Sequence, residues 1–195
     1  MNLPIIIISY KSFSNLKKCI SNLGNKRQIL IIENSDFNEI KKNIENLYQN
    51  CNVIVNNDNF GYGKAANIGL QKVNSKYALI LEADVKISEI QLNQIENEIS
   101  KCDKDFALAT PIYDDLIDFN KNNNFDNELS KININENVQE TKTKIDLIKG
   151  CSLIVNLDKF KNENVFDENF FFFFEDIDLC KRVKKKMKIF LFLIR

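Results

Sequence analysis

Four short apolar runs, each followed by a segment with helical periodicity, constrain the fold of this 195-residue chain more than any other feature. The runs are rich in β-branched residues, which suits strands buried on both faces of a sheet; they read PIIIISY, QILIIEN, NVIVNN and YALILEAD. In the segments that follow, apolar residues recur three and four positions apart, as Leu16, Ile20 and Leu23 do after the first run. Repeated strand–helix units predict an α/β fold: a Rossmann-like, mostly parallel sheet flanked by helices on both faces.

Polar residues stand where each predicted strand ends. They are Ser9 and Tyr10, Glu33 and Asn34, Asn56 to Asn59, and Glu82 and Asp84. Ligands of open α/β sheets bind beyond the carboxyl ends of the strands. The sequence therefore predicts a polar crescent, and a ligand site, at one edge of the sheet.

The pattern breaks after residue 112. Asp114–Lys144 is polar and asparagine-rich without a sustained period, which predicts a long loop or mobile insertion. Order returns at IDLIKGCSLIVNLDKF, which predicts a strand pair or one long strand around Gly150, and KIFLFLIR predicts one more strand. We therefore read 1–195 as a single domain made of 1–112, a variable insertion 113–144, and 145–195.

The composition excludes several classes of function. Lys and Arg together number 27, as do Asp and Glu, so the net charge predicts no strong attraction to nucleic acid or anionic lipid. The chain has no histidine, so catalysis would depend on carboxylates, lysines or a hard metal ion. Its five cysteines are widely spaced, which fits a reducing cytosol. No run approaches the ~20 apolar residues of a membrane span.

Glu82 and Asp84 end the fourth strand, in the stretch LEADV. Alternation relaxes at a strand end, so both carboxylates can turn toward one cation, and oxygen ligands of this kind suit Mg²⁺ or Mn²⁺. A solvated strand end that leads into a turn explains the same residues.

Two glycines, Gly61 and Gly63, open a predicted helix in NFGYGKAANIG. Such glycines let backbone N–H groups approach a phosphate, and Lys64 would add positive charge. The stretch is neither the dinucleotide fingerprint nor a Walker loop, and a plain turn with a helix start fits equally well. In IIENSD, a carboxylate at Glu33 can accept from a base or ribose hydroxyl, and Ser35 or Asp36 is expected to cap the next helix.

Five consecutive phenylalanines run into Glu175, Asp176 and Asp178 in NFFFFFEDIDLCKR. Acidic residues in the first turn of a helix favour its macrodipole, each by roughly 0.3–1 kcal/mol. Desolvation beside an apolar run would instead raise a carboxyl pKa toward the range of a general base. Both interpretations remain open at this level.

The order and spacing of six blocks resemble the family 2 glycosyltransferases, most closely the bacterial rhamnosyltransferase-like branch that builds surface polysaccharide. The blocks are IIIISYKSFSNLKKCISNL, IIENSD, NFGYGKAANIGL, YALILEADVKI, IKGCSLIVNLDKF and FDENFFFFFEDIDLCKRV. The resemblance implies a GT-A fold, a nucleotide-diphosphate sugar donor, Mg²⁺ or Mn²⁺, and transfer with inversion. Residues 1–112 would form the nucleotide-binding half and 145–195 the acceptor and catalytic-base half.

The resemblance also implies roles for individual residues. Asp176 would be the catalytic base, supported by Glu175 and Asp178, and Asp84 the metal-side carboxylate, helped by Glu82. The nucleotide and its phosphates would lie along Ser9, Tyr10, Glu33, Asn59, Gly61, Lys64 and Asn67. Gly150 and Cys151 would border the donor and acceptor cleft.

Three departures from the family pattern leave alternatives open. The stretch EAD replaces the usual DxD, Glu33 replaces an aspartate, and the chain ends at Arg195 without the histidine that often follows the acidic motif. The last departure predicts a C-terminally shortened member, either active or a catalytically impaired nucleotide-binding remnant. A sugar-nucleotide nucleotidyltransferase is a weaker alternative, because SYKSFSN is not the glycine-rich loop of that class.

The resemblance further implies a cytoplasmic enzyme, at most peripherally attached to the inner face of the membrane. Its partners would be the donor and a saccharide or lipid-linked acceptor, with no nucleic acid.

Overall fold

The computed structural model describes residues 2–102, 106–111, 143–144, 148–186 and 189–192. Most of the predicted insertion 113–144 lies outside this range, since residues 113–142 are not described, and Thr143–Lys144 forms a short strand, β6. Within the described ranges, no helix combines the length and the apolar character needed to cross a bilayer.

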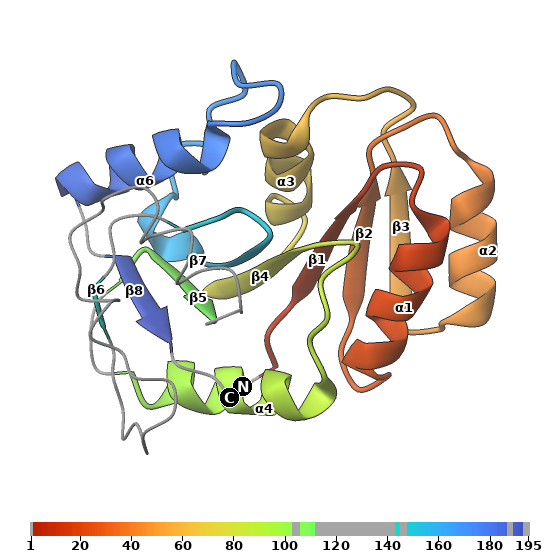
Figure 1. The fold of residues 1–195 in the computed structure, drawn as a ribbon, viewed down its shortest axis with the longest axis horizontal. Coiled ribbons are helices and arrows are strands. Elements are labelled where there is room, and N and C mark those ends of the chain that lie inside the picture. The colour runs from red at the N-terminus through yellow and green to blue at the C-terminus, as the bar shows by residue number, and fades with distance from the viewer. Residues whose placement is uncertain (1, 103–105, 112–142, 145–147, 187–188, 193–195) are drawn as a thin grey trace.

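A single mixed sheet of eight strands forms the centre of the molecule, in the order β3-β2-β1-β4-β7-β5-β8-β6 (Figure 1). The four neighbours at one end pair in parallel: β1 (Ile5–Ser9), β2 (Ile29–Glu33), β3 (Cys51–Val55) and β4 (Tyr77–Glu82). The strand β7 (Ser152–Asn156) runs antiparallel to β4 and to β5 (Leu108–Pro111), and β8 (Ile189–Phe192) pairs in parallel with β5. The predicted fold class is thereby confirmed, and so is the additional strand in KIFLFLIR.

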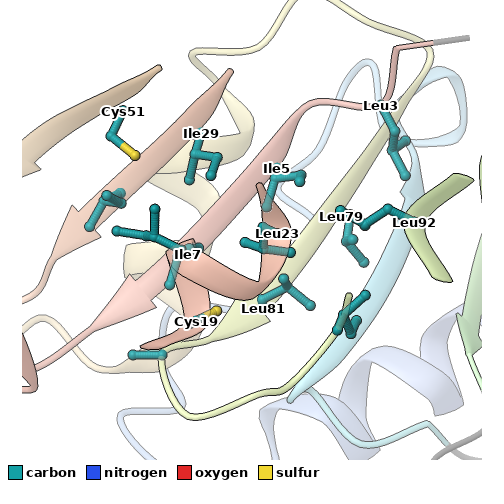
Figure 2. Packing of buried hydrophobic residues seen from close by; sticks show 14 of the residues in the cluster. Leu3, Ile5, Ile7, Cys19, Leu23, Ile29, Cys51, Leu79, Leu81 and Leu92 are labelled. Atoms are coloured by element: carbon teal, nitrogen blue, oxygen red, sulfur yellow. The ribbon is translucent and has the colours of Figure 1, made fainter. Parts of the chain in front are cut away.

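Helices cover both faces of the sheet, because alternate strand residues present apolar side chains to opposite sides. Ile5 and Ile7 of β1 pack with α1 (Phe13–Leu23), α2 (Glu39–Leu47) and α4 (Glu89–Ser100). Ile6 and Ile8 pack with α3 (Tyr62–Leu70) and α6 (Glu175–Lys186). Figure 2 shows the first of these layers, in which Leu23 and Leu92 reach the strand residues from α1 and α4.

The structure corrects two local expectations. In the described part of the stretch predicted as a strand pair or one long strand, residues 148–160, Gly150 lies in a turn, and one strand, β7, follows it and leads into a 3₁₀ helix, η2 (Leu157–Lys159). Neither Ser35 nor Asp36 caps α2, whose N-cap is Asn38 without a side-chain bond. The Ser35 hydroxyl has other partners before α2 begins: it donates to Glu33 and accepts from the Phe37 amide.

A buried ion pair joins the loop before β2 to α4. Two nitrogens of Arg27 donate to Glu96, each at 3.0 Å, and the Leu3 amide donates to the same carboxylate at 2.9 Å. Burial alone would raise the pKa of Glu96, but the hydrogen bond and charge of Arg27 hold this pKa below its usual value. The pair therefore contributes stability above the unfolded-state pKa of glutamate, and this contribution is lost as the pH falls through the folded-state pKa.

We expect Glu96→Gln to lower the free energy of unfolding by about 2 kcal/mol at pH 7, since it leaves the Arg27 charge buried without its counter-ion. Urea unfolding at pH 7 and pH 4 measures this, and the variant should lose less stability than wild type over that interval. Glu98→Gln, a partly exposed position on the same helix, is the control. If Glu96→Gln and Glu98→Gln lost equal stability, the loss would come from a general weakening of α4 and not from the Arg27–Glu96 ion pair.

Candidate active site

The first turns of α3 and α6 lie side by side at the upper edge of Figure 1, near the carboxyl ends of the parallel strands. The Tyr62 amide at the start of α3 donates to the Phe171 carbonyl, 3.2 Å away, just before α6 begins. Gly63 faces Glu175 so closely that a Cβ at Gly63 would lie 3.7 Å from the Glu175 Cβ. Segments a hundred residues apart in sequence therefore meet at the edge that strand polarity predicts.

Acidic residues of two elements lie near this contact: Glu175 and Asp176 begin α6, and Glu82 ends β4, with the exposed Asp84 two residues beyond it. The pKa of Glu82 is raised, first by burial and then by the negative charges of the other three, while Lys149 opposes the shift. The pKa of Glu175 is raised by burial and by Asp176, against the effect of its own backbone hydrogen bond. The site thus concentrates negative charge that a bound cation would neutralise.

Tyr62 lies among these carboxylates, and sequence reasoning did not single it out. Its hydroxyl donates to the Gly150 carbonyl at 2.6 Å, and its ring meets Phe166 edge-to-face with centroids 5.8 Å apart. Burial raises the pKa of Tyr62 well above its usual value, and nearby Glu82 adds to the shift. The only signal in the sequence was its place between the two glycines that open α3.

Asp176 faces the turn that contains Gly150. One carboxylate oxygen accepts from the Gly150 amide at 3.3 Å, and the other accepts from the Ile177 amide at 2.7 Å. The Glu82 amide, in turn, donates to the Cys151 carbonyl at 3.0 Å. The Gly150–Cys151 turn therefore connects the backbone at the end of β4 with the Asp176 carboxylate of α6.

The three acidic residues of α6 have different surroundings. Glu175 is buried, and its Oε2 has no hydrogen-bond partner among the described residues. Asp178 instead receives a 2.6 Å hydrogen bond from Arg182, which also donates to the Val165 carbonyl. Asp178 thus fixes the segment before α6, and its carboxylate is already paired.

A metal site is not complete in the protein alone. No group of three or more Asp, Glu or Cys side chains in the described part of the chain is arranged to hold an ion. The chemistry of Glu82 and Asp84 nevertheless fits Mg²⁺ or Mn²⁺, because both supply hard oxygen ligands next to surplus negative charge. The remaining ligands would have to come from a bound phosphate group.

The residues predicted at the nucleotide end are held by a separate network. Glu33 is fully buried; its Oε1 accepts from the Lys11 amide and the Ser35 hydroxyl, while its Oε2 has no partner among the described residues. Ser9, opposite Glu33 in the sheet, is also buried, and its hydroxyl likewise has no partner in the described part. Tyr10 is 53% exposed.

Asn34 organises the loop between β3 and α3, a role that the sequence did not reveal. Its amide nitrogen donates to Asn59 Oδ1 and to the Gly61 carbonyl, at 2.9 and 3.1 Å. Its amide oxygen accepts from Asn56 and from the Phe60 backbone. Because Gly61 and Tyr62 are consecutive, this network adjoins the carboxylate cluster.

Lys64 and Asn67 turn instead toward residues 166–168. The Asn67 side chain exchanges hydrogen bonds with both backbone groups of Phe166 and also donates to Glu168. The Lys64 ammonium lies 4.0 Å from Glu168 and 4.8 Å from the centre of the Phe60 ring. Both side chains therefore hold the segment before α6 against α3.

The composition of the phenylalanine run suggests that its rings form a buried apolar surface beside the carboxylates. In the structure they do not. Phe171 to Phe174 are 58–65% exposed. The apolar surroundings of Glu175 come from Phe166 and the start of α3, which pack closely enough that a Cβ on Gly63 would lie 3.0 Å from Phe166.

Comparisons with known proteins concern the fold and the family. The chain is 14% identical to S. aureus TarS 1–349, with a TM-score of 0.68, over 98% of this chain and 58% of that one. The mannosyltransferase PcManGT from Pyrobaculum calidifontis is 9% identical, with a TM-score of 0.68, over 100% of this chain and 57% of that one. GalNAc-T7 is 13% identical, with a TM-score of 0.70, over 98% of this chain and 42% of that one. At these identities the likeness concerns the fold, and the chain spans less than two thirds of each of these structures.

No curated protein matches the chain. A family model described as "Glycosyl transferase family 2" matches residues 5–162, from β1 to beyond η2. Since this match covers most of the chain and the sheet is that of GT-A glycosyltransferases, the chain belongs to glycosyl transferase family 2.

Proposed function

We propose that this protein transfers a sugar from a nucleotide-diphosphate sugar to an acceptor hydroxyl, with inversion at the anomeric carbon. The observation that supports this most directly is that the Gly150–Cys151 turn bonds both to the backbone of Glu82, at the end of β4, and to the carboxylate of Asp176, at the start of α6. A glycosyl transfer needs positive charge near a departing diphosphate and a proton acceptor near the attacking hydroxyl. Glu82 and Asp84 would hold the cation that supplies the positive charge, and Asp176 would accept the proton.

In this proposal Asp176 accepts the proton of the acceptor hydroxyl while that oxygen attacks the anomeric carbon. The bond from this carbon to the diphosphate breaks in the same displacement, and the nucleoside diphosphate leaves. Glu82 and Asp84 would hold Mg²⁺ or Mn²⁺, which supplies positive charge to the departing phosphates. Glu175, buried and with a raised pKa, would support Asp176.

The donor would extend from the carboxylates toward Asn59, Gly61 and the buried Glu33, with Ser9 and Tyr10 at its nucleoside end. Similar structures hold such compounds: TarS binds UDP-GlcNAc, and PcManGT binds GDP-Man and Mn²⁺. The sequence resemblance to the rhamnosyltransferase-like branch favours thymidine or uridine diphosphate sugars as the first donors to test, and a role in bacterial surface polysaccharide synthesis.

Thermal denaturation with a panel of nucleotide diphosphates and their sugars, with and without Mn²⁺, tests the proposal. We expect one nucleotide family to raise Tm by about 5–10 °C at saturating concentration, and only with Mn²⁺ present. Pyrophosphate release from a sugar phosphate and a nucleoside triphosphate would instead indicate a nucleotidyltransferase. Binding without any turnover of the donor would favour an impaired nucleotide-binding protein.

Glu82→Gln should change stability and ligand binding in opposite directions. Because the folded-state pKa of Glu82 is raised, its charge destabilises the free protein at pH 7, and this cost disappears as the pH falls through that pKa. Without ligands we expect the variant to melt about 2–4 °C higher than wild type at pH 7, with a smaller gain on acidification. It should also lose most of the Mn²⁺-dependent shift. Glu98→Gln should show neither change; a lower Tm for Glu82→Gln would contradict the assignment of Glu82 to a site of surplus charge.

A further inference from the structure

Four consecutive aromatic side chains, Phe171 to Phe174, form an exposed apolar patch next to the active site. They are 58–65% exposed, and the rings of Phe172 and Phe173 are in contact, with centroids 4.0 Å apart. Four rings exposed to this extent present roughly 400 Å² of apolar surface, the size at which a patch marks an interaction site. The other large exposed apolar residues of the described part, Tyr10, Leu47 and Ile90, are scattered singly.

The backbone holds these rings outward. The Phe171 carbonyl accepts from the Tyr62 amide, and the Phe174 carbonyl accepts from the Asp178 amide at 2.8 Å, so both ends of the segment are anchored. Between these anchors Phe173 and Phe174 have φ values of +63° and +69°. Aromatic residues rarely adopt this left-handed conformation because it costs free energy, and such strain persists where the surrounding structure imposes it, often at functional segments.

The exposed charge on α6, the helix that follows the patch, is basic. Lys181, Lys184 and Lys185 of α6 are exposed and recur at a spacing of three and four, which places them along one face of the helix. The neighbouring acidic groups are buried or have other partners: Glu175 is buried, and Asp178 is paired with Arg182. The partly buried Asp176 accepts from the Gly150 amide, and the exposed Glu168 lies 4.0 Å from Lys64. The overall charge of the chain is zero, so this local excess of positive charge on α6 is not apparent from the composition.

We propose that the surface formed by Phe171–Phe174 and the lysines of α6 docks on an anionic lipid bilayer. The rings would enter the interface between headgroups and acyl chains, and the ammonium groups would contact lipid phosphates. Figure 1 shows α6 along the upper edge of the molecule, with the segment before it projecting from the same edge. Docking there would bring the carboxylate site, which begins at Glu175, close to the membrane; this inference does not depend on sugar transfer.

A second copy of the chain is a less suitable occupant for the same surface. A two-fold contact centred on the patch would place the rings of one copy against those of the other, and it would leave the lysines in the later turns of α6 without an anionic partner. An anionic bilayer satisfies both the apolar and the basic parts of the surface.

Co-sedimentation of the full chain with vesicles tests the proposal. Wild type should bind phosphatidylcholine–phosphatidylglycerol vesicles at least about tenfold more tightly than pure phosphatidylcholine vesicles, and added salt should weaken this binding. Phe173→Asn/Phe174→Asn should reduce the partition coefficient by about tenfold or more. Its Tm should stay the same or rise, because asparagine tolerates positive φ better than phenylalanine. Lys181→Gln/Lys185→Gln should weaken binding to the anionic vesicles alone, again by about tenfold.

Matched controls come from the opposite layer of helices. Ile90→Asn removes a residue that is 72% exposed on α4, and Lys18→Gln/Lys42→Gln removes two exposed charges on α1 and α2. Both controls should bind vesicles as wild type does, and equal losses in controls and test variants would overturn the proposal. So would the absence of vesicle binding, or sedimentation velocity showing that the phenylalanine variant dissociates a dimer of the chain.

Discussion

Replacing Asp176 with asparagine should lower kcat for sugar transfer by about 10²–10⁴-fold, the usual contribution of a positioned general base. Asparagine keeps the size and the hydrogen-bonding shape of the side chain, so the contact with the Gly150 amide can persist. What it removes is the ability to accept the acceptor proton. Initial rates of donor consumption, measured with the donor that the thermal panel identifies, would show the loss.

Donor binding should be nearly unchanged in this variant, because Asp176 lies across the Gly150–Cys151 turn from the β4 carboxylates proposed to hold the metal. Asp178→Asn is the matched control, since it makes the same chemical change two residues later on α6. It breaks the pair with Arg182 and should lower Tm, while kcat falls by less than about tenfold. Equal transfer rates in wild type and Asp176→Asn would remove Asp176 from the role of base.

Gly61→Ala should be the most destabilising single substitution considered, with a loss of about 3 kcal/mol or more in the free energy of unfolding. Gly61 has a φ of +79°, which L residues adopt only at a cost. A Cβ there would also lie 2.1 Å from the Phe171 carbonyl oxygen, a backbone atom that cannot move aside without displacing the segment before α6. The substitution would therefore separate α3 from α6 and disrupt the Tyr62–Phe171 bond as well.

Gly24→Ala separates these two causes. Gly24 has nearly the same φ, +77°, but its added Cβ would meet the flexible end of Glu89, at 2.7 Å. Backbone strain alone should cost about 1–3 kcal/mol there, because the φ and ψ of Gly24, +77° and −166°, lie in a region that residues other than glycine rarely adopt. Urea unfolding of both variants gives the difference, and a donor titration should show weaker binding for Gly61→Ala only. If both variants lost the same stability, the close approach to Phe171 would have no energetic role.

Local patterns in the sequence predicted much of the framework. The β-branched runs and the helical periodicity specify β1 to β4 and the helices between them, because burial on both faces requires that composition. Strand polarity then implies that Ser9, Glu33 and Glu82 share an edge, and the register between β1 and its two neighbours places them there.

Other features depended on contacts that no local pattern encodes. β7 pairs antiparallel with both β4 and β5, which its apolar composition does not specify, and the Gly150 turn is bonded to Tyr62 and Asp176. The roles of Tyr62 and Asn34 likewise arise from partners far away in sequence. Hydrogen-bond partners at such separations are selected by the packed fold, so reading the residues one by one cannot identify them.

The phenylalanine run shows most clearly how the information in the sequence differs from what the packed fold determines. Its composition favours burial of the rings in an apolar environment, but composition alone does not determine whether the protein interior has space for them. Phe166, Leu179 and Val183 already fill the layer between α3, α6 and the sheet, at the close packing of a protein core. The sequence by itself therefore determined which segments form the sheet and where charge can collect. Only the tertiary structure decided that the Gly150–Cys151 turn bonds to both the end of β4 and Asp176, and that four aromatic rings are exposed, because both outcomes depend on how segments distant in the sequence pack together.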